Sequence, residues 1–392
     1  MKKIRKIAAN LIFPVTAPPI KNGVLVFEDQ KLVDILDRGG KLTETERCEF
    51  YNGVLVPGLI NAHCHLELSH LFGKIPQNMG MKEFLQNVMM RKADYETQIL
   101  YAKRSDRFMQ LAGIVAVGDI SNTNITLDIK RASPIIYHTF VEVLGLDERY
   151  TPERYKAAVS LYEEFQSHGL AASVTPHAAY SVHRDLLERI ASFQQDGVLS
   201  IHTLENPIEC EKLTKQENSF LRFFHELAIE SNFENHDHPY HYLLTPFFNR
   251  KVLLVHNLTS GMVDWQVAQN IAQIRNLELF LVTCPRSNMF IHGKIPDYST
   301  WPKDLPICIG TDSLASNFDL SVFRELLFLT QHSPFLFTDV LPWATINGAK
   351  ALGLEDRLGS FDLGKTPGVN LITGFDFSRQ ALLPHATLQR VH

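Results

Sequence analysis

The sequence predicts an α/β fold, a TIM (β/α)8 barrel beside a small β-rich subdomain built from both chain ends. Eight short apolar runs across residues 57–356 are each followed by an amphipathic segment. Runs of this length, bounded by turns, are typical of parallel strands buried on both faces. A polar side chain closes each run, and the functional residues of such a barrel lie at the carboxyl ends of its strands. Glycine-punctuated β-like runs at both chain ends predict the subdomain.

The predicted subdomain comprises residues 1–56 and 357–392. Its β-like runs are KIAANLIFPV, GVLVFEDQ, KLVDILD, GVLVPGLI and, near the C-terminus, VNLIT. The basic and apolar start of the chain resembles a signal peptide, but Asn10 interrupts the apolar part and Pro14 ends it. The residues that follow alternate like a strand that stays in the protein, so we expect no signal peptide.

The central runs alternate with helical segments over about 250 residues, which is typical of a barrel of eight strands. They are LVPGLINAH, GIVAVGDIS, PIIYHTFVEVLG, LAASVTPHA, GVLSIHTLE, KVLLVHNLT, LELFLVTCP and LPICIGTDS. A doubly wound open sheet is the alternative, but no glycine-rich phosphate-binding loop follows any of these runs.

Composition narrows the classes of function. The chain has 392 residues, 45% hydrophobic and 21% charged, with a formal net charge of −5. This ordinary globular composition lacks the basic stripe that nucleic-acid binding requires. No stretch approaches the ~18 apolar residues of a membrane span. Scattered single cysteines indicate reduced thiols, so we expect a cytoplasmic protein. The cysteines are Cys48, Cys64, Cys210, Cys284 and Cys308.

The ends of the predicted strands concentrate metal-binding side chains. His63 and His65 close the first run on one face of the strand, so both can point at one centre. The other runs end in Asp119, Glu142, His177, His202 with Glu205 beyond it, His256, Cys284 and Asp312. A lone histidine at a strand end is usually structural, but five with a final aspartate predict one shared metal site. Histidine and carboxylate suit a divalent ion such as Zn²⁺, with one position left for water.

A series of motifs follows in order along nearly the whole chain. They are PGLINAHCHLELSH, TPHAAYSVH, IHTLE, LVHNL, CPRSN, GTDSLASN and ATINGAKALGLEDRLGSFDLGK. Together they resemble the amidohydrolase superfamily, and within it the deaminase and chlorohydrolase branch. The resemblance implies a metal-dependent hydrolase barrel at residues 57–356. It also implies that the subdomain formed by the two chain ends is a β-sandwich.

By this resemblance the metal ligands are His63, His65, His202 and Asp312. Relatives with two metals carry a bridging lysine or glutamate, commonly at the end of the fourth strand. The corresponding segment, SVTPHAAYS at residues 173–181, contains neither. We therefore expect one divalent ion, with Zn²⁺ preferred and Fe²⁺ or Mn²⁺ as alternatives.

The resemblance assigns the other strand-end residues to a hydrolytic deamination. His256 orients the metal-bound water, Glu205 shuttles protons, and His177 touches the substrate. A Zn²⁺-type ion lowers the pKa of bound water towards ~7, and Asp312 takes the proton. The resulting hydroxide attacks the amino-bearing carbon of a purine-like heterocycle. Glu205 protonates the ring nitrogen and then helps ammonia to leave.

Three residues beside the two first histidines have simpler interpretations. Cys64 faces the opposite side of the strand, so we expect a small buried filler. Glu67 either fixes a ligand histidine or caps the following turn. We expect His70 to be structural.

Two arginines and one loop are further candidates for substrate contact. Arg149 follows the third predicted strand and Arg286 follows the seventh, and each either binds a substrate anion or is a solvated side chain. The histidine-rich segment at residues 231–243 is expected to be a polar surface loop, with a lid near the substrate as the alternative.

We expect an aminohydrolase that acts on a small-molecule N-heterocyclic amine. NAHCHLELSHL and GTDSLASN look most like the aminodeoxyfutalosine deaminases of menaquinone biosynthesis. Guanine, adenosine-type and triazine deaminases share most of these residues, and a cyclic amidase like the imidazolonepropionases is another alternative. A non-catalytic, heterocycle-binding relative is the remaining one, although every ligand and the proton shuttle are present. Relatives often pair, so we expect a homodimer.

Overall fold

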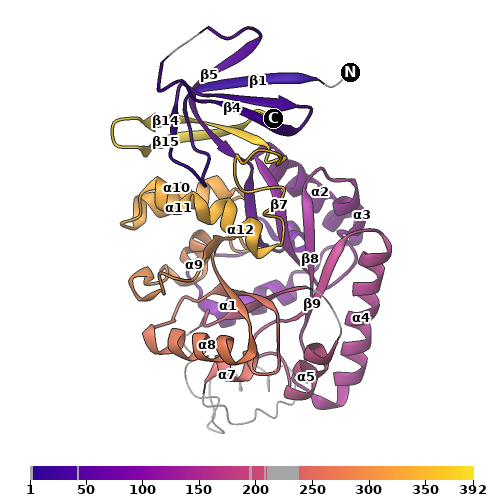
Figure 1. The fold of residues 1–392 in the computed structure, drawn as a ribbon. Coiled ribbons are helices and arrows are strands. Elements are labelled where there is room, and N and C mark those ends of the chain that lie inside the picture. Colours follow the sequence, from indigo (N-terminus) through magenta and orange to yellow (C-terminus); the bar gives the residue numbers. More distant parts are fainter. Residues whose placement is uncertain (1–2, 42–43, 194–196, 207–208, 210–237) are drawn as a thin grey trace.

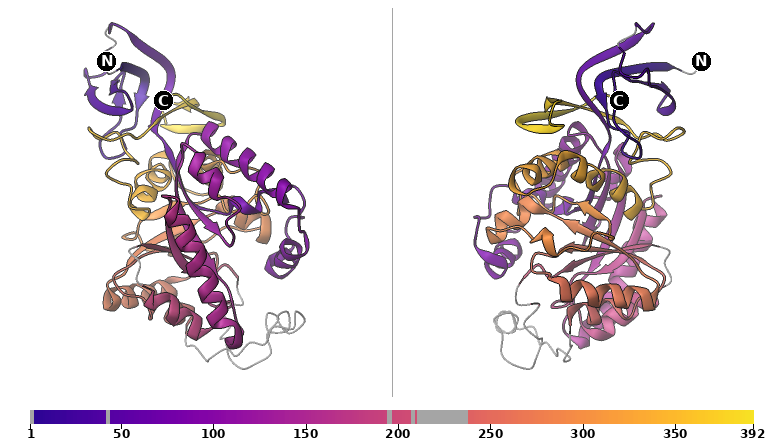
Figure 2. Two further views of the ribbon diagram at one scale, coloured as in Figure 1. Left: turned by 90° about the vertical axis from the view of Figure 1, so that its right-hand side faces the viewer. Right: turned by 60° about the vertical axis from the view of Figure 1, so that its left-hand side comes forward.

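The computed structural model describes residues 3–41, 44–193, 197–206, 209 and 238–392. Its strands form two four-stranded parallel sheets from the middle of the chain and one seven-stranded sheet from the two ends. Figure 1 shows the seven-stranded sheet at one end of the molecule, with the parallel strands and their helices beyond it. The views in Figure 2 agree, and both termini lie at that end. The predicted α/β class with parallel strands is confirmed.

The first parallel sheet has the strand order β6-β7-β8-β9. Its strands are β6 (Leu59–Cys64), β7 (Ile114–Ser121), β8 (Ile136–Val143) and β9 (Ala171–Pro176). The intervening and following helices are η1 (Leu66–Leu71), α1 (Gly80–Met90), α2 (Tyr95–Leu111), α3 (Leu127–Ala132), η2 (Glu148–Tyr150), α4 (Thr151–Ser167) and α5 (Arg184–Ser192). Every residue of β6 and β7 is buried, as expected for strands that are covered on both faces.

The second parallel sheet has the order β10-β11-β12-β13. Its strands are β10 (Val198–Thr203), β11 (Lys251–His256), β12 (Glu278–Thr283) and β13 (Ile307–Ile309). Its helices are α7 (Pro239–Leu244), α8 (Met262–Arg275), α9 (Pro285–His292), η4 (Tyr298–Thr300), α10 (Val322–His332), α11 (Phe337–Val340), η5 (Pro342–Ala344) and α12 (Ile346–Ala351). All eight predicted central strands are therefore present.

The two parallel sheets touch at both pairs of outer strands. Ala178, just after β9, forms a parallel bridge with His202 of β10. Cys64, the last residue of β6, forms another with Asp312, just after β13. The carboxyl ends of β6 and β10 are thereby fixed beside those of β13 and β9, and these ends carry the candidate site residues.

The seven-stranded sheet joins the two ends of the chain. Its order is β15-β14-β5-β1-β3-β4, and β2 pairs with β1. Its strands are β1 (Ile4–Ile12), β2 (Ile20–Lys21), β3 (Val24–Glu28), β4 (Lys31–Leu36), β5 (Cys48–Pro57), β14 (Val369–Asp376) and β15 (Ala381–Arg390). Because β5 runs parallel to β1 and antiparallel to β14, it connects both chain ends in one sheet. The sandwich form and the domain limits stay predictions.

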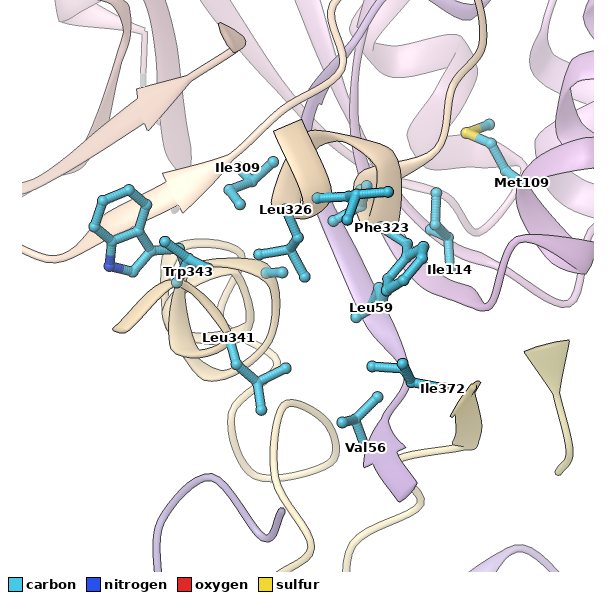
Figure 3. Packing of buried hydrophobic residues seen from close by; sticks show 14 of the residues in the cluster. Val56, Leu59, Met109, Ile114, Ile309, Phe323, Leu326, Leu341, Trp343 and Ile372 are labelled. Atoms are coloured by element: carbon cyan, nitrogen blue, oxygen red, sulfur yellow. The ribbon is translucent and has the colours of Figure 1, made fainter. Parts of the chain in front are cut away.

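A buried apolar cluster connects this sheet to the parallel strands. Figure 3 labels Val56, Leu59, Met109, Ile114, Ile309, Phe323, Leu326, Leu341, Trp343 and Ile372 within it. Leu59 begins β6, so burying its side chain, worth about 1.5–3 kcal/mol, fixes the start of the strand that ends in the first two site histidines. Among the helices in the described ranges, none is long and apolar enough to cross a membrane.

Candidate metal centre and active site

Four of the predicted site residues converge from three strand ends. The Nε2 atom of His65 lies 3.1 Å from that of His63 and 3.3 Å from that of His202. It also lies 3.5 Å from Oδ1 of Asp312. None of the four residues is more than 9% exposed. The structure therefore brings together all four predicted metal ligands.

The spacing and chemistry of this cluster fit one divalent ion. Ligand atoms held at about 2.0–2.2 Å from one metal lie roughly 3–3.6 Å from one another. Burial lowers the pKa of His63 and of His202 well below the ordinary histidine value, and burial also lowers that of His65. Neutral imidazoles offer lone pairs, and lone pairs turned towards one centre repel unless a cation lies between them.

Close packing behind the ligands fixes the end of β6. Nδ1 of His63 lies 3.4 Å from the hydroxyl of Ser200 on β10. A Cβ atom at Gly310 would lie 2.8 Å from Cβ of His63 and 2.9 Å from Sγ of Cys284. Only glycine at position 310 lets the segment after β13 approach β6 this closely.

Two serines orient the carboxylate of Asp312. Ser287 and Ser316 each donate a hydrogen bond of 2.6 Å to Oδ2, which leaves Oδ1 facing His65. Burial of Asp312 opposes its ionisation. His65, His256 and His63, together with the hydroxyl of Ser287, nevertheless hold its pKa below the usual value. Both serines lie in motifs that resemble the family, CPRSN and GTDSLASN, yet the sequence assigned neither a role.

His256 lies beside the cluster with a fixed orientation. Its backbone has a positive φ of 72°, which is uncommon for a residue other than glycine. Its Nδ1 lies 3.0 Å from Oδ1 of Asn288, and its Nε2 lies 3.4 Å from Oε1 of Glu205. Because a carbonyl oxygen only accepts, Nδ1 carries the proton and Nε2 presents its lone pair to the site.

Glu205 is buried at the mouth of the same centre. Burial raises the pKa of its carboxyl well above the ordinary value, and the negative charges of Asp312 and Glu209 add to the effect. Glu209 accepts hydrogen bonds from the backbone N–H groups of Leu204, Glu205 and Asn206. This second carboxylate, which sequence reasoning missed, fixes the turn that carries Glu205.

Two further buried acids lie near the centre, Glu142 on β8 and Glu67 in the turn after β6, and only Glu142 faces a proposed ligand. Oε1 of Glu142 lies 3.4 Å from Nδ1 of His202, and its Oε2 accepts from the Asn122 side chain at 3.1 Å. Burial raises the pKa of Glu142 to about 8. Glu67 accepts from the backbone N–H of Asn122 at 3.1 Å and from the hydroxyl of Thr123 at 3.0 Å. Glu67 therefore holds the loop after β7, which is neither of the roles predicted for it.

The centre opens into a cavity of about 500 Å³. That volume is within the range of small-molecule sites. Its inner wall contains His65, His177, His202, Glu205, His256 and Asp312. Its outer wall is largely apolar, with Met81, Phe84, Leu85, Val88 and Met89 of α1, Leu144 and Leu146. His177 is held by Ser181, whose Oγ lies 2.6 Å from its Nδ1.

The two predicted substrate arginines do not line this cavity. Arg149 is exposed, and its guanidinium pairs with Asp147 at 2.6 Å. Arg286 pairs with Asp319 at 2.8 Å. Arg154 of α4 does line the cavity, and within the described part of the chain it forms no ion pair. Sequence reasoning missed Arg154, whose only signal was its place five residues after Arg149.

Of the remaining candidates, the described residues His238, His241 and Cys64 do not line the cavity. His238 accepts the Tyr240 N–H at the start of α7 and lies 2.7 Å from Asp264, and His241 is exposed. His236 and the rest of residues 231–237 lie outside the described residues. Cys64 is fully buried, as predicted.

The fold and the strand-end site agree with what comparison with known proteins shows. The chain belongs to the amidohydrolase family, whose model matches residues 54–384. It is therefore a hydrolase acting on carbon–nitrogen bonds, and the resemblance seen in the motifs is confirmed.

Two sequence relatives and one solved structure are similar to this chain. An adenosine deaminase from Helicobacter pylori is 30% identical over 92% of this chain and 89% of its own length. An aminodeoxyfutalosine deaminase from Nitratiruptor sp. is 28% identical over 82% of this chain and 79% of its own. The solved structure of Helicobacter pylori aminofutalosine deaminase with methylthio-coformycin has a TM-score of 0.82. It is 24% identical and covers 99% of this chain and 100% of that one.

Proposed function

We propose that this protein is a metal-dependent deaminase of adenine nucleosides, holding one divalent ion, Zn²⁺ by preference, on His63, His65, His202 and Asp312. One observation carries the proposal. Three imidazole Nε2 atoms and a carboxylate oxygen converge at the floor of a nucleoside-sized cavity, with His256 and Glu205 beside them. The named activities of the two sequence relatives support the same substrate class.

Asp312 and Glu205 carry out different proton transfers, and His256 orients the attacking water. When bound, a divalent ion supplies a Lewis acid and a water of lowered pKa. Asp312 takes a proton from the attacking water, and Nε2 of His256 orients that water because Nδ1 is committed to Asn288. Water oxygen bonds to the amino-bearing carbon while Glu205, kept protonated by its burial, protonates the ring nitrogen. Asp312 then passes the proton that it took from water to the amino group, Glu205 takes back a proton from the new hydroxyl group, the C–N bond breaks, ammonia leaves, and the ring is left in the keto form.

The preferred substrate is an adenine nucleoside with an anionic extension, as in the aminodeoxyfutalosine of menaquinone biosynthesis. The name of the Nitratiruptor relative supports this choice. The cavity supports it too, because its largely apolar outer wall suits an aromatic extension, and Arg154, which forms no ion pair with any described residue, suits a carboxylate. We propose Arg154 for this contact in place of Arg149 and Arg286, whose guanidinium groups pair with Asp147 and Asp319.

The architecture proposed around this site is a barrel that closes through the two bridges beside the ligands. The backbone bonds there support closure. The N–H of His202 donates to the carbonyl of His177 at 2.9 Å, and that of Asp312 donates to the carbonyl of His63 at 3.1 Å. The β-sandwich, the homodimer and the cytoplasmic location stay predictions from the sequence.

An ammonia-release assay tests the function. We expect deamination of aminodeoxyfutalosine and weaker deamination of adenosine and methylthioadenosine, together with about one metal ion per chain by elemental analysis. Activity on guanine or a triazine, with none on any adenine nucleoside, would refute the substrate class. Absence of metal from active protein would refute the centre.

A further inference from the structure

The turn that follows the two first histidines lacks its usual local cap. A helix normally begins with a side chain that accepts one of the free backbone N–H groups of the first turn. The short helix η1 begins after His65, and the His65 side chain makes no capping hydrogen bond. Its Nε2 is turned towards His63 and His202 instead.

A neighbouring strand supplies the missing acceptor. Oδ1 of Asp119, on β7, accepts the N–H of Leu66 at 2.8 Å. Asp119 is fully buried, and a buried carboxylate needs a partner. Lys130 of α3 lies 2.7 Å from its other oxygen, Oδ2.

Lys130 is itself buried and has no role in the proposed reaction. Its Nζ donates hydrogen bonds to Ser121 at 2.8 Å and to Thr139 at 3.1 Å, and these two bonds and the ion pair with Asp119 hold the ammonium in place. The ring of Phe165 lies 5.0 Å from the ammonium. Its position is therefore fixed from every side, and it fixes Asp119 in turn.

We propose that Asp119 and Lys130 are positioning residues for the metal centre. Asp119 caps η1 from outside the helix, which frees the His65 imidazole to act as a ligand, and Lys130 holds the carboxylate in place. The inference rests on the proposed function in one respect, that His65 binds the metal. Groups that orient ligands in this way typically contribute 10–100-fold to metal affinity.

Two charge-balanced double variants separate the cap from the ion pair. Asp119→Asn with Lys130→Met removes both charges but keeps an oxygen that accepts the Leu66 N–H. Asp119→Ala with Lys130→Met also removes both charges, and it removes the acceptor too. Zn²⁺ affinity is measured by competition with a chromophoric chelator, and amide hydrogen exchange at residues 66–71 is measured on the metal-free proteins.

The alanine variant should bind Zn²⁺ about 10–100-fold more weakly than the wild type, with faster exchange at Leu66, while the asparagine variant stays close to the wild type in both. Asp106→Asn is the control, since this buried carboxylate accepts from Ser133 and Tyr137 away from the site. It should lower the Tm without changing Zn²⁺ affinity.

Equal Zn²⁺ affinity and equal exchange in the two double variants would overturn the positioning role. Failure of the proposed function can be distinguished from failure of the positioning role, because the wild-type protein itself would then bind no Zn²⁺ in the same titration. In that case hydrogen exchange alone decides whether Asp119 caps η1, and unchanged exchange in the alanine variant refutes it. Should the alanine variant fail to fold while the asparagine variant folds, the acceptor is needed for the turn itself.

Discussion

The inner and outer walls of the cavity are built in different ways. The inner wall consists of side chains at strand ends, where the ligand atoms of His65 lie 3.1–3.5 Å from those of the other three ligands, those of His63 and Asp312 lie 3.9 Å apart, and the four residues are at most 9% exposed. The outer wall comes chiefly from α1, the loop after β8 and the start of α4, and it is largely apolar, although Asp147, Tyr150 and Arg154 also line it. Val88 is only partly buried there, and Met89 is 51% exposed.

Because of this difference, we expect the inner wall to carry out the reaction and the outer wall to determine which substrate is preferred. Strand ends are fixed by the hydrogen bonds of the parallel sheets, so they can hold several ligands within a few tenths of an ångström. Helices and loops at the rim tolerate substitution with little effect on that geometry. We therefore expect changes to the inner wall to abolish turnover for every substrate, and changes to the outer wall to alter preference among substrates.

The largest effect should follow from removing a ligand of the inner wall. His65→Ala leaves three of the four proposed ligands, so we expect loss of bound metal and a fall in turnover of more than about 10⁴-fold, beyond what one acid–base group contributes. Elemental analysis and ammonia release measure the two losses. His70→Ala is the matched control, because His70 lies in the same turn with its Nδ1 on the Glu67 carbonyl. Metal retained at the wild-type level in His65→Ala would remove His65 from the ligand set.

The second largest loss of activity should follow from Glu205→Gln. The amide keeps the shape of the side chain but cannot transfer a proton, so kcat should fall by about 10²–10⁴-fold while metal content is unchanged. Measuring kcat and the metal content of the same preparation tests this prediction. Near-normal kcat would assign the proton transfer to another group.

The contrast between the walls also explains what the sequence could predict. His63 and His65 were found because alternation along a strand puts both on one face, and strand ends of a barrel meet at one rim. All eight central strands were predictable for a similar reason, since buried parallel strands are short apolar runs between turns.

Partners that lie far apart in sequence were not predictable. Arg286 was a reasonable substrate contact until the structure placed Asp319, 33 residues later, against its guanidinium. Ser287 and Asn288 were visible in the CPRSN motif, but their contacts with Asp312 and His256 depend on how β11, α9 and the end of β13 pack. The pairing of Arg149 with Asp147, by contrast, was local and readable from LGLDERY.

Arg154→Met should produce the largest effect on the outer wall. A charge-assisted hydrogen bond to a carboxylate contributes about 1.5–3 kcal/mol, so KM for aminodeoxyfutalosine should rise about 10–100-fold. The KM for methylthioadenosine, which has no carboxylate, should stay nearly constant. Arg149→Met is the matched control and should change neither. An equal rise in KM for both nucleosides would make Arg154 a structural residue.

The smallest effect should come from the apolar part of the outer wall. Val88→Ala removes two methyl groups from a partly buried position, so at most about 1 kcal/mol of apolar contact is lost, or roughly fivefold in KM. Because an apolar contact does not distinguish charge, KM should rise by a similar factor for aminodeoxyfutalosine and methylthioadenosine, unlike in Arg154→Met. Met90→Ala, on the same helix but 81% exposed, is the control and should leave both KM values unchanged. A change in kcat with constant KM in Val88→Ala would mean that α1 acts on the chemistry, and the separation between the two walls would no longer hold.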